Sequence, residues 1–539
     1  MSEQYDVIIL GAGANGLICA NYLAKAGGKV AIVEKNLETG GGFATEDAAG
    51  YKFVHHAIYM MVAELMPAYN DLNLKDRGVA FVRPEAQQAF LLDGKKSFVL
   101  YSDVEKSKRS IARLSPKDAE TFGRMYQEFN EMCLSFLIPA AYVPAVEPLE
   151  QMILLNQAGD MGRRVVELSE MTPREVIADY KFEHPGVEAG LLYLSSMYDL
   201  DPEAGGMGFM VPLFVSRLTN AALVRAGSHQ FSSVLRWEFE GNGGEVITSA
   251  EVTEPLWDDS AVAGIKLANG RELRARAVVS TLNPEQTFLQ FCGRQHIPED
   301  LAITADDWQW DDWSLFIANW GVIGEPPRYD GYDAEVNQAL SVVMGFNKPD
   351  DVLDHVETLR RGELPAEVRG HGTCLSLFDR LSIPYHMPPP FSPNATLRWE
   401  CWAPYDLNWG EEKEKYSRKC FETWTRYAPN LSEASVVSSI SLSPKDIERR
   451  LNNMARGSIK TGAYITLQMG FNRPSPACSS YRTPIKGLYM AGASTHPGGM
   501  IVLGNGYNAA RVLCEDLGLD VWWSVPEMVQ KARNAGYIP

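Results

Sequence analysis

Three glycines near the amino terminus have the spacing of a turn that binds a dinucleotide. Gly11, Gly13 and Gly16 stand between an apolar run at residues 7–10 and an apolar helical pattern at residues 17–26. The first glycine permits a tight bend, the second lets backbone approach a pyrophosphate, and the third lets helix and strand pack closely. The pattern therefore predicts a strand, a turn, and a helix whose amino-terminal N–H groups face phosphates.

A carboxylate and a second glycine cluster extend this prediction. Residues 29–34 read as a strand that ends in Glu34, roughly 20 residues after the glycines, where a ribose hydroxyl can donate to it. Gly41 and Gly42 belong to a cluster that a simple nicotinamide domain does not need, and they bring further N–H groups towards phosphates and a ribityl chain. The flanking residues expected in the same site are Ala14, Asn15 and Lys35.

The carboxyl-terminal part of the chain carries a matching signature. An apolar strand at residues 488–491 stops at Gly492, and a helix is expected at residues 505–518. The loop between them contains Gly499, Met500 and Ile501. Their N–H groups, with the helix dipole behind them, can hydrogen-bond the pyrimidine side of an isoalloxazine ring and stabilise the charge of reduced flavin. His496 lies in a His-Pro turn, where it either shapes the loop or acts as a base.

These stretches together resemble the phytoene desaturase, carotenoid isomerase and retinol saturase group of FAD proteins, within the amine oxidase superfamily. Further segments similar to that group lie at residues 231–235, 243–254, 275–284, 442–450 and 481–489. The resemblance covers most of the chain. It implies FAD as the cofactor, with Val252 packed on the adenine. It also implies an α/β fold, in which a discontinuous Rossmann-type FAD-binding domain carries an inserted α+β substrate domain.

The length of 539 residues exceeds a single hydrophobic core and indicates two or three domains. The FAD-binding domain is expected from residues 1–99, 225–290 and 475–539. A helical insertion is expected at 100–224, where Ser115 and the proline after it mark a helix start. A substrate-binding domain is expected at 291–474, with strands at 314–320 and 395–402. The large aromatic residues of this last domain either line an apolar site or form its core.

Three residues after the glycine cluster are candidates for proton transfer: His55, His56 and Tyr59. Loss of a hydride to flavin N5 leaves a neighbouring proton that needs an acceptor. Since adjacent residues of a strand point to opposite faces, at least one of the two histidines is expected to be structural. The eight cysteines form no CxxC pair, so neither a metal site nor a redox-active disulfide is predicted.

The sequence therefore predicts an FAD-dependent oxidoreductase that acts on CH–CH groups of an apolar isoprenoid, terpene or alicyclic substrate. Its electrons would pass to a quinone, oxygen or another carrier. Two alternatives stay open: a redox-neutral isomerase or saturase that works from reduced FAD, and an amine or amino-acid oxidase. Against the oxidase, Ala493 follows Gly492 where amine oxidases commonly carry glutamate. The intact glycines favour cofactor binding over a carrier that lacks catalysis.

Charge and hydropathy limit the partners. The net charge of −18, with no basic stripe, argues against nucleic acid. With no leader and no apolar run of membrane-spanning length, the chain is expected to be cytoplasmic. The apolar, proline-interrupted segment at residues 134–146 is either a core or lid helix or a point of peripheral membrane contact. The sequence pattern specifies neither the substrate nor the oligomeric state.

Overall fold

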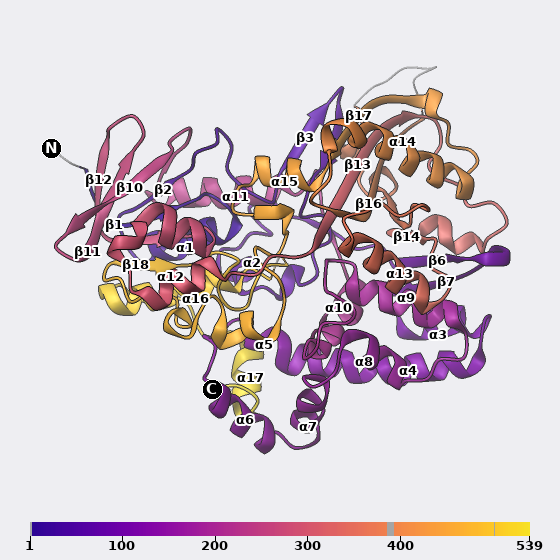
Figure 1. Cartoon of the computed structure of the whole chain (residues 1–539), viewed down its shortest axis with the longest axis horizontal. Helices are drawn as coiled ribbons and strands as arrows, with labels where there is room; N and C mark the ends of the chain where they lie inside the picture. The colour runs from indigo at the N-terminus through magenta and orange to yellow at the C-terminus, as the bar shows by residue number, and fades with distance from the viewer. Residues whose placement is uncertain (1–2, 385–392, 501) are drawn as a thin grey trace.

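The computed structural model describes residues 3–384, 393–500 and 502–539, and two seven-stranded sheets organise this part of the chain (Figure 1). The first sheet runs in the order β10-β11-β12-β1-β2-β9, with β18 also paired to β12. Its strands are β1 (Glu3–Leu10), β2 (Val30–Val33), β9 (Glu245–Ile247), β10 (Val252–Asp258), β11 (Ala261–Leu267), β12 (Glu272–Ser280) and β18 (Leu488–Met490). The predicted strands at 7–10, 29–34 and 488–491 are thus confirmed.

Five strands of this sheet form parallel pairs, which are β1 with β2, β1 with β12, β2 with β9 and β12 with β18. Parallel strands align their carboxyl ends at one edge of the sheet, where α/β folds bind their ligands. β1, β2 and β12 reach this edge at Leu10, Val33 and Ser280. Segments from the beginning, middle and end of the chain therefore meet there, as the resemblance to FAD proteins implied.

Helix α1 (Ala14–Lys25) follows β1 and packs against α16 (Gly504–Leu517). Both predicted helices are confirmed, and the predicted terminating glycine, Gly518, adopts the left-handed conformation at the end of α16. The two helices approach closely at Gly506, where a Cβ atom would lie 2.1 Å from the Asn15 backbone oxygen. A glycine is required at this crossing because any side chain would push α16 away from the glycine turn.

The second sheet has the order β17-β13-β16-β15-β14-β6-β7. Its strands are β6 (Ala86–Leu92), β7 (Lys96–Tyr101), β13 (Trp313–Ile323), β14 (Ser341–Met344), β15 (Gly370–Cys374), β16 (Asn394–Pro404) and β17 (Val436–Leu442). The predicted strands at 314–320 and 395–402 are β13 and β16, which pair along their whole length. β6 and β7 belong to this sheet, although β6 and most of β7 fall in the stretch 1–99 that was predicted for the FAD-binding domain. The predicted division into domains stays a prediction.

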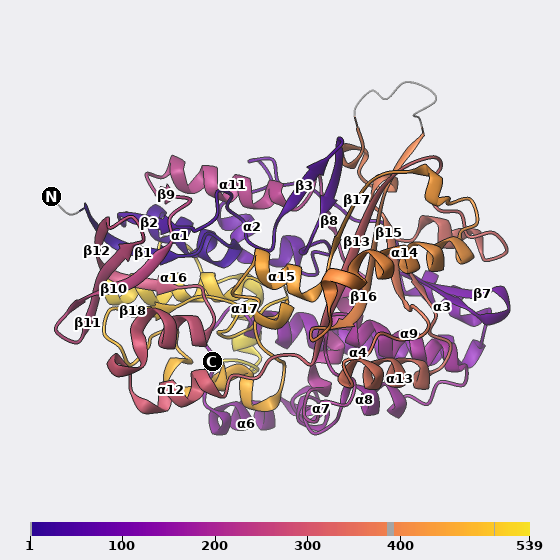
Figure 2. The ribbon, with the colours of Figure 1, turned by 45° about the horizontal axis from the view of Figure 1, so that its top comes forward.

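Helices cover one side of the second sheet, as Figure 2 shows for α3, α4, α8 and α9. The helices of the predicted insertion are α3 (Val104–Ala112), α4 (Pro116–Met132), α5 (Ile138–Ala140), α6 (Pro148–Gln157), α7 (Gly159–Leu168), α8 (Pro173–Asp179), α9 (Pro185–Ser196) and α10 (Val211–Leu218). Ser115 caps α4 as expected, because its hydroxyl accepts a hydrogen bond from the Asp118 backbone N–H at 3.1 Å.

The remaining helices lie outside the predicted helical insertion, and one of them, α14 (Trp409–Tyr427), packs on the second sheet through the contact of Tyr416 with Phe316. The helices are α2 (Pro67–Asp71), α11 (His229–Gly241), α12 (Glu299–Asp306), α13 (Pro349–Arg360), α14 (Trp409–Tyr427), α15 (Pro444–Arg450) and α17 (Glu527–Asn534). Two small sheets pair β3 (Thr45–Ala48) with β4 (Tyr51–Val54), and β5 (Phe81–Val82) with β8 (Leu223–Val224). Among the residues described, no helix combines the length and the hydropathy needed to cross a bilayer.

Candidate cofactor and substrate site

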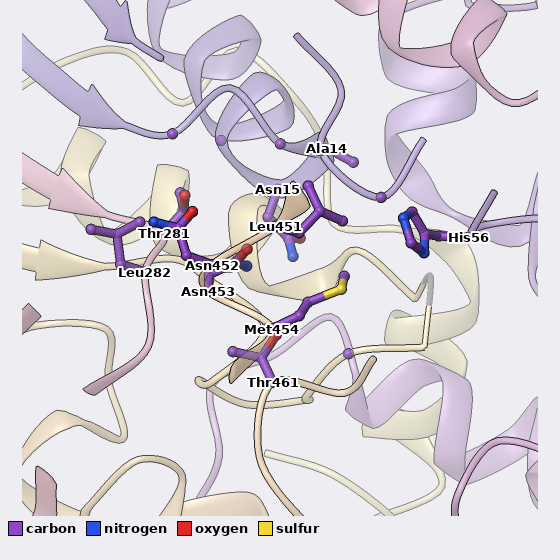
Figure 3. A pocket seen from close by; sticks show the side chains of 18 of the residues that line it. Ala14, Asn15, His56, Thr281, Leu282, Leu451, Asn452, Asn453, Met454 and Thr461 are labelled. Atoms are coloured by element: carbon purple, nitrogen blue, oxygen red, sulfur yellow. The ribbon is translucent and has the colours of Figure 1, made fainter. Parts of the chain in front are cut away.

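A cavity of about 410 Å³ lies at the carboxyl edge of the first sheet. Gly11, Glu34 and Thr281, which directly follow β1, β2 and β12, all line it. Figure 3 shows Asn15 at the start of α1 on one side of the cavity, with Met454 and Thr461 on the other. The same cavity extends to β13 of the second sheet, so it joins the nucleotide-binding edge to the second sheet.

The glycine turn forms a cradle that a side chain would fill. Gly13 caps α1 with φ −70°, and a Cβ atom there would meet no protein atom within 4 Å. Neither backbone strain nor protein packing therefore requires glycine at this position, whereas close approach of a ligand does. Gly16 differs, since its Cβ would lie 2.3 Å from the Gly11 oxygen. The cradle thus fits a pyrophosphate at the amino terminus of α1.

Glu34 is held beside this turn by two backbone hydrogen bonds. Its carboxylate accepts from the Ala12 N–H at 2.9 Å and from the Asn36 N–H at 3.0 Å. A carboxylate has further lone pairs for ribose hydroxyls. The other predicted nucleotide residues on the cavity wall are Ala14, Asn15, Lys35, Gly41, Gly42 and Val252. All residues predicted for the nucleotide half of the site therefore border one space.

The loop between β18 and α16 forms another wall. Gly492, Gly499 and Met500 line the cavity, while Ile501 lies outside the described residues. Helix α16 begins at Gly504, and Leu503 and Asn505 at its amino terminus line the cavity, while the Gly506 N–H donates to the Asn15 side-chain oxygen at 3.4 Å. This arrangement fits the polar edge of an isoalloxazine ring, because N–H groups and a helix dipole both stabilise negative charge.

His496 is part of this loop but does not border the cavity. Its Nε2 pairs with the Ala140 carbonyl oxygen at 3.0 Å, and its own carbonyl accepts from the Tyr481 hydroxyl at 2.9 Å. Burial lowers the pKa of His496 below its usual value. Of the two roles expected for His496, these contacts favour the shaping of the loop.

The structure separates the two adjacent histidines. His56 lines the cavity, and neither of its ring nitrogens has a hydrogen-bond partner within the described residues. His55 turns away from the cavity, and its Nε2 pairs with the Glu46 carboxylate at 3.1 Å. Tyr59 also lines the cavity, with its hydroxyl hydrogen-bonded to the Thr373 hydroxyl. His56 and Tyr59 are thus brought to the site, whereas His55 is not.

Burial controls the protonation of these side chains. Burial and the Arg450 guanidinium lower the pKa of His55 to about 4. Burial, together with the neighbouring His55, holds the pKa of His56 well below its usual range. Burial also raises the pKa of Tyr59 above its usual value. At neutral pH both histidines are therefore neutral, and Tyr59 keeps its proton.

Several residues of the wall were not anticipated from the sequence. They are Met61, Tyr198, Thr281, Leu282, Leu315, Ile317, Asn452, Asn453, Met454, Ile459 and Thr461. Thr281 and Leu282 had a usable signal, because they follow a recognised strand at the ligand-binding edge. The sequence carries no comparable signal for Asn452, Asn453 and Met454. Trp399 and Trp402, two of the large aromatic residues, form part of the core rather than an apolar binding site, because both are buried and neither borders the cavity.

Comparisons with known proteins identify the family. Residues 15–287 match the family model of flavin containing amine oxidoreductases. The chain is 37% identical to a limonene dehydrogenase subunit of Castellaniella defragrans, and the alignment covers 100% of both chains. It is 22% identical to the lycopene-forming phytoene desaturase of Paracoccus sp., covering 95% of this chain and 97% of the relative. It is 24% identical to prolycopene isomerase 1 of an Oncidium hybrid cultivar, over 96% and 85%.

Solved structures agree on the fold. Putrescine oxidase bound to putrescine aligns with a TM-score of 0.61 at 15% identity, covering 96% of this chain and 99% of that one. Cyclohexylamine oxidase from Brevibacterium oxydans aligns with a TM-score of 0.59 at 15% identity, covering 95% and 99%. The family match, the full-length relative and the cradle around Gly13 lead to one conclusion. This chain belongs to the flavin-containing amine oxidoreductase family and is an FAD-dependent oxidoreductase.

Proposed function

We propose that the protein dehydrogenates a CH–CH bond in an apolar terpene-type substrate. The observation that carries this proposal is the continuity of one cavity from the Gly13 cradle to an apolar wall. The apolar residues of that wall are Met61, Leu315, Ile317, Ile459 and Leu503. Leu315 and Ile317 stand two apart on β13 and so share one face of the strand. The full-length relative, named a limonene dehydrogenase, supports the same substrate class.

The reaction requires two hydrogens to leave adjacent carbons. FAD, when bound, accepts one of them as a hydride. The other leaves as a proton, and the electron pair of its C–H bond forms the new double bond. We assign His56 as the proton acceptor, because its imidazole is neutral, borders the cavity and has no partner in the described structure. Tyr59 stays protonated and positions the substrate by contact.

The walls also exclude water from the reacting carbons. Tyr59, Met61 and Tyr198 are all buried yet border the cavity, so they place hydrophobic surface around a bound hydrocarbon. Exclusion of water and fixed orientation are the main contributions that a protein makes when the cofactor carries the chemistry. The site therefore needs few acid–base groups beyond His56.

We further propose that the electrons leave through a partner rather than a second site in this chain. The acceptor is a quinone, oxygen or another carrier. The relative is named a subunit, which supports a partner chain here as well. Peripheral membrane contact also stays a prediction. Exposed Leu149, Met152 and Ile153 on α6 support an apolar contact just after the segment predicted for it.

Anaerobic bleaching of the oxidised flavin absorption tests the substrate class. The protein is mixed without oxygen with limonene, acyclic terpenes, carotenoids, alicyclic acids and amines in turn. We expect bleaching by a terpene and none by amines. Bleaching by amines alone would contradict the proposal in favour of an amine oxidase. Isomerisation of a terpene without bleaching would contradict it in favour of a redox-neutral isomerase.

A further inference from the structure

Arg473 is a fully buried cation whose hydrogen bonds all go to backbone carbonyls. Its Nε donates to the Ala493 oxygen at 3.1 Å, Nη1 to the Gln468 oxygen at 2.9 Å, and Nη2 to the Lys460 oxygen at 2.9 Å. The guanidinium carbon lies 5.2 Å from the ring centroids of both Trp308 and Tyr464. Aromatic faces and carbonyls stabilise the cation, but they do not neutralise it.

The charged groups around Arg473 leave its charge uncompensated. Lys460 and Asp311 form a buried ion pair at 2.7 Å and cancel each other. Burial raises the pKa of Asp199 to about 8, so this acid is mostly protonated at neutral pH. His496 is neutral because burial lowers its pKa. Burial lowers the pKa of Arg473 and the Asp311 charge opposes this, but among the described residues no carboxylate forms an ion pair with Arg473. One positive charge therefore remains.

This charge lies directly behind the loop that borders the cofactor site. Ala493, whose carbonyl accepts from Arg473, lines the cavity together with Gly499 and Thr461. The backbone of Lys460 packs on Gly499 so closely that a Cβ there would lie 3.0 Å from the Lys460 Cα. A buried cation is costly unless an anion is near, and in a water-poor interior its field extends through a peptide layer.

We propose that Arg473 raises the reduction potential of bound FAD by stabilising the negative charge that the isoalloxazine ring gains on reduction. Arg473 acts through the loop at residues 492–500 and does not border the cavity, so it is a positioning residue rather than a catalytic one. The inference rests on the FAD site and not on the proposed terpene substrate.

The test compares holoenzymes of the wild type, Arg473→Gln and Arg473→Lys. The midpoint potential is measured anaerobically against a reference dye, and the affinity for sulfite, a nucleophile that prefers electron-poor flavins, is measured from flavin absorbance. Arg473→Gln is expected to lower the potential by about 30 mV or more, which is a factor of about ten in the equilibrium constant of a two-electron couple. Sulfite binding is expected to weaken by a similar factor, and Arg473→Lys is expected to restore most of both.

Arg217→Gln is the matched control. Arg217 is also buried, but its bonds go to Asn130 and Ser216, which do not border the cavity. This variant is expected to leave the potential unchanged.

An FAD-loaded Arg473→Gln protein with wild-type potential and sulfite affinity would overturn the inference. If that variant loses FAD, Arg473→Met is measured in its place, because it also removes the charge but keeps a long unbranched side chain beside Trp308 and Tyr464. A wild-type potential and sulfite affinity in Arg473→Met would overturn the inference. Neither the midpoint potential nor the sulfite affinity depends on a substrate. A negative result for Arg473 would therefore leave the terpene proposal untouched, and the reverse also holds.

Discussion

At the scale of single residues, the hydrogen-bond partners of three histidines decide which of them can act in the cavity. His55 and His496 are neighbours of the cofactor segments in sequence, yet each has a hydrogen-bond partner outside the cavity. His56 borders the cavity and has none in the part of the chain that the structure describes. Sequence spacing placed all three histidines near the flavin but could not decide between them, because their directions depend on contacts that form only in the folded chain, with Glu46 across a hairpin and with the distant Ala140.

Replacement of His56 tests its role as proton acceptor. His56→Gln is expected to slow substrate-dependent bleaching about 10²-fold or more, the usual contribution of a general base, while FAD stays bound. His496→Gln is the control and is expected to keep most of the rate, because His496 does not border the cavity. Stopped-flow absorbance under anaerobic conditions measures both. A wild-type bleaching rate in His56→Gln would contradict the assignment.

Gly13 and Gly16 give a second test at this scale. Gly13→Ala is expected to fold as stably as the wild type in the apo form, because its Cβ meets no protein atom within 4 Å and its φ of −70° suits alanine. It is expected to lose FAD affinity at least about tenfold, since the methyl group enters the cradle.

Gly16→Ala should instead lower the apo stability as well, because its Cβ would lie 2.3 Å from the Gly11 oxygen. Thermal unfolding of the apo proteins and flavin fluorescence titration separate the two effects. Equal FAD affinity of Gly13→Ala and the wild type would show that the pyrophosphate lies elsewhere.

At the scale of elements, local sequence patterns predicted the cofactor half and missed most of the substrate half. The turn after β1, the carboxylate after β2 and the loop before α16 each carry a signature within a few consecutive residues. The wall around Asn452, Asn453 and Met454 consists of irregular chain, and its place near β1 follows only from the global fold. The strands β13 and β16 were recognised from alternation, but alternation does not show that Leu315 borders a cavity.

The crossing of α1 and α16 can be tested by adding one methyl group. Gly506→Ala is expected to destabilise the protein by about 1–3 kcal/mol, since its Cβ would overlap the Asn15 oxygen. The exposed Gly410 of α14 provides the matched control: Gly410→Ala is expected to stabilise by up to about 1 kcal/mol, because alanine favours helix and no close contact results. Chemical denaturation of both variants gives the comparison. Equal stability of the two variants would contradict the tight crossing.

At the scale of the whole molecule, buried neutral histidines make stability depend on pH. Burial and the Arg450 guanidinium lower the pKa of His55 to about 4, while burial and Arg369 lower the pKa of His355 to about 3. Unfolding returns the pKa of both histidines to about 6.5, so the unfolded chain takes up protons at a pH where the folded protein does not. Their stabilising contribution is present above about pH 6.5 and is lost as the pH falls towards 4 and then 3.

The melting temperature is therefore expected to fall steadily between about pH 6.5 and pH 4, with proton uptake on unfolding. Replacing His355 by a residue that does not titrate, as in His355→Phe, should reduce this slope if the variant folds. Calorimetry at several pH values measures the slope in both proteins. A melting temperature that is constant over this range would contradict the neutral state of these histidines.

The proposed reaction forms a carbon–carbon double bond in the substrate and reduces bound FAD. The most direct measurement is a single anaerobic turnover with the terpene that bleaches the flavin best, followed by mass spectrometry of the extracted hydrocarbon. We expect one product molecule for each FAD reduced, with a mass that shows the loss of two hydrogen atoms. Flavin bleaching without such a product, or a product of unchanged mass, would contradict the proposed dehydrogenation.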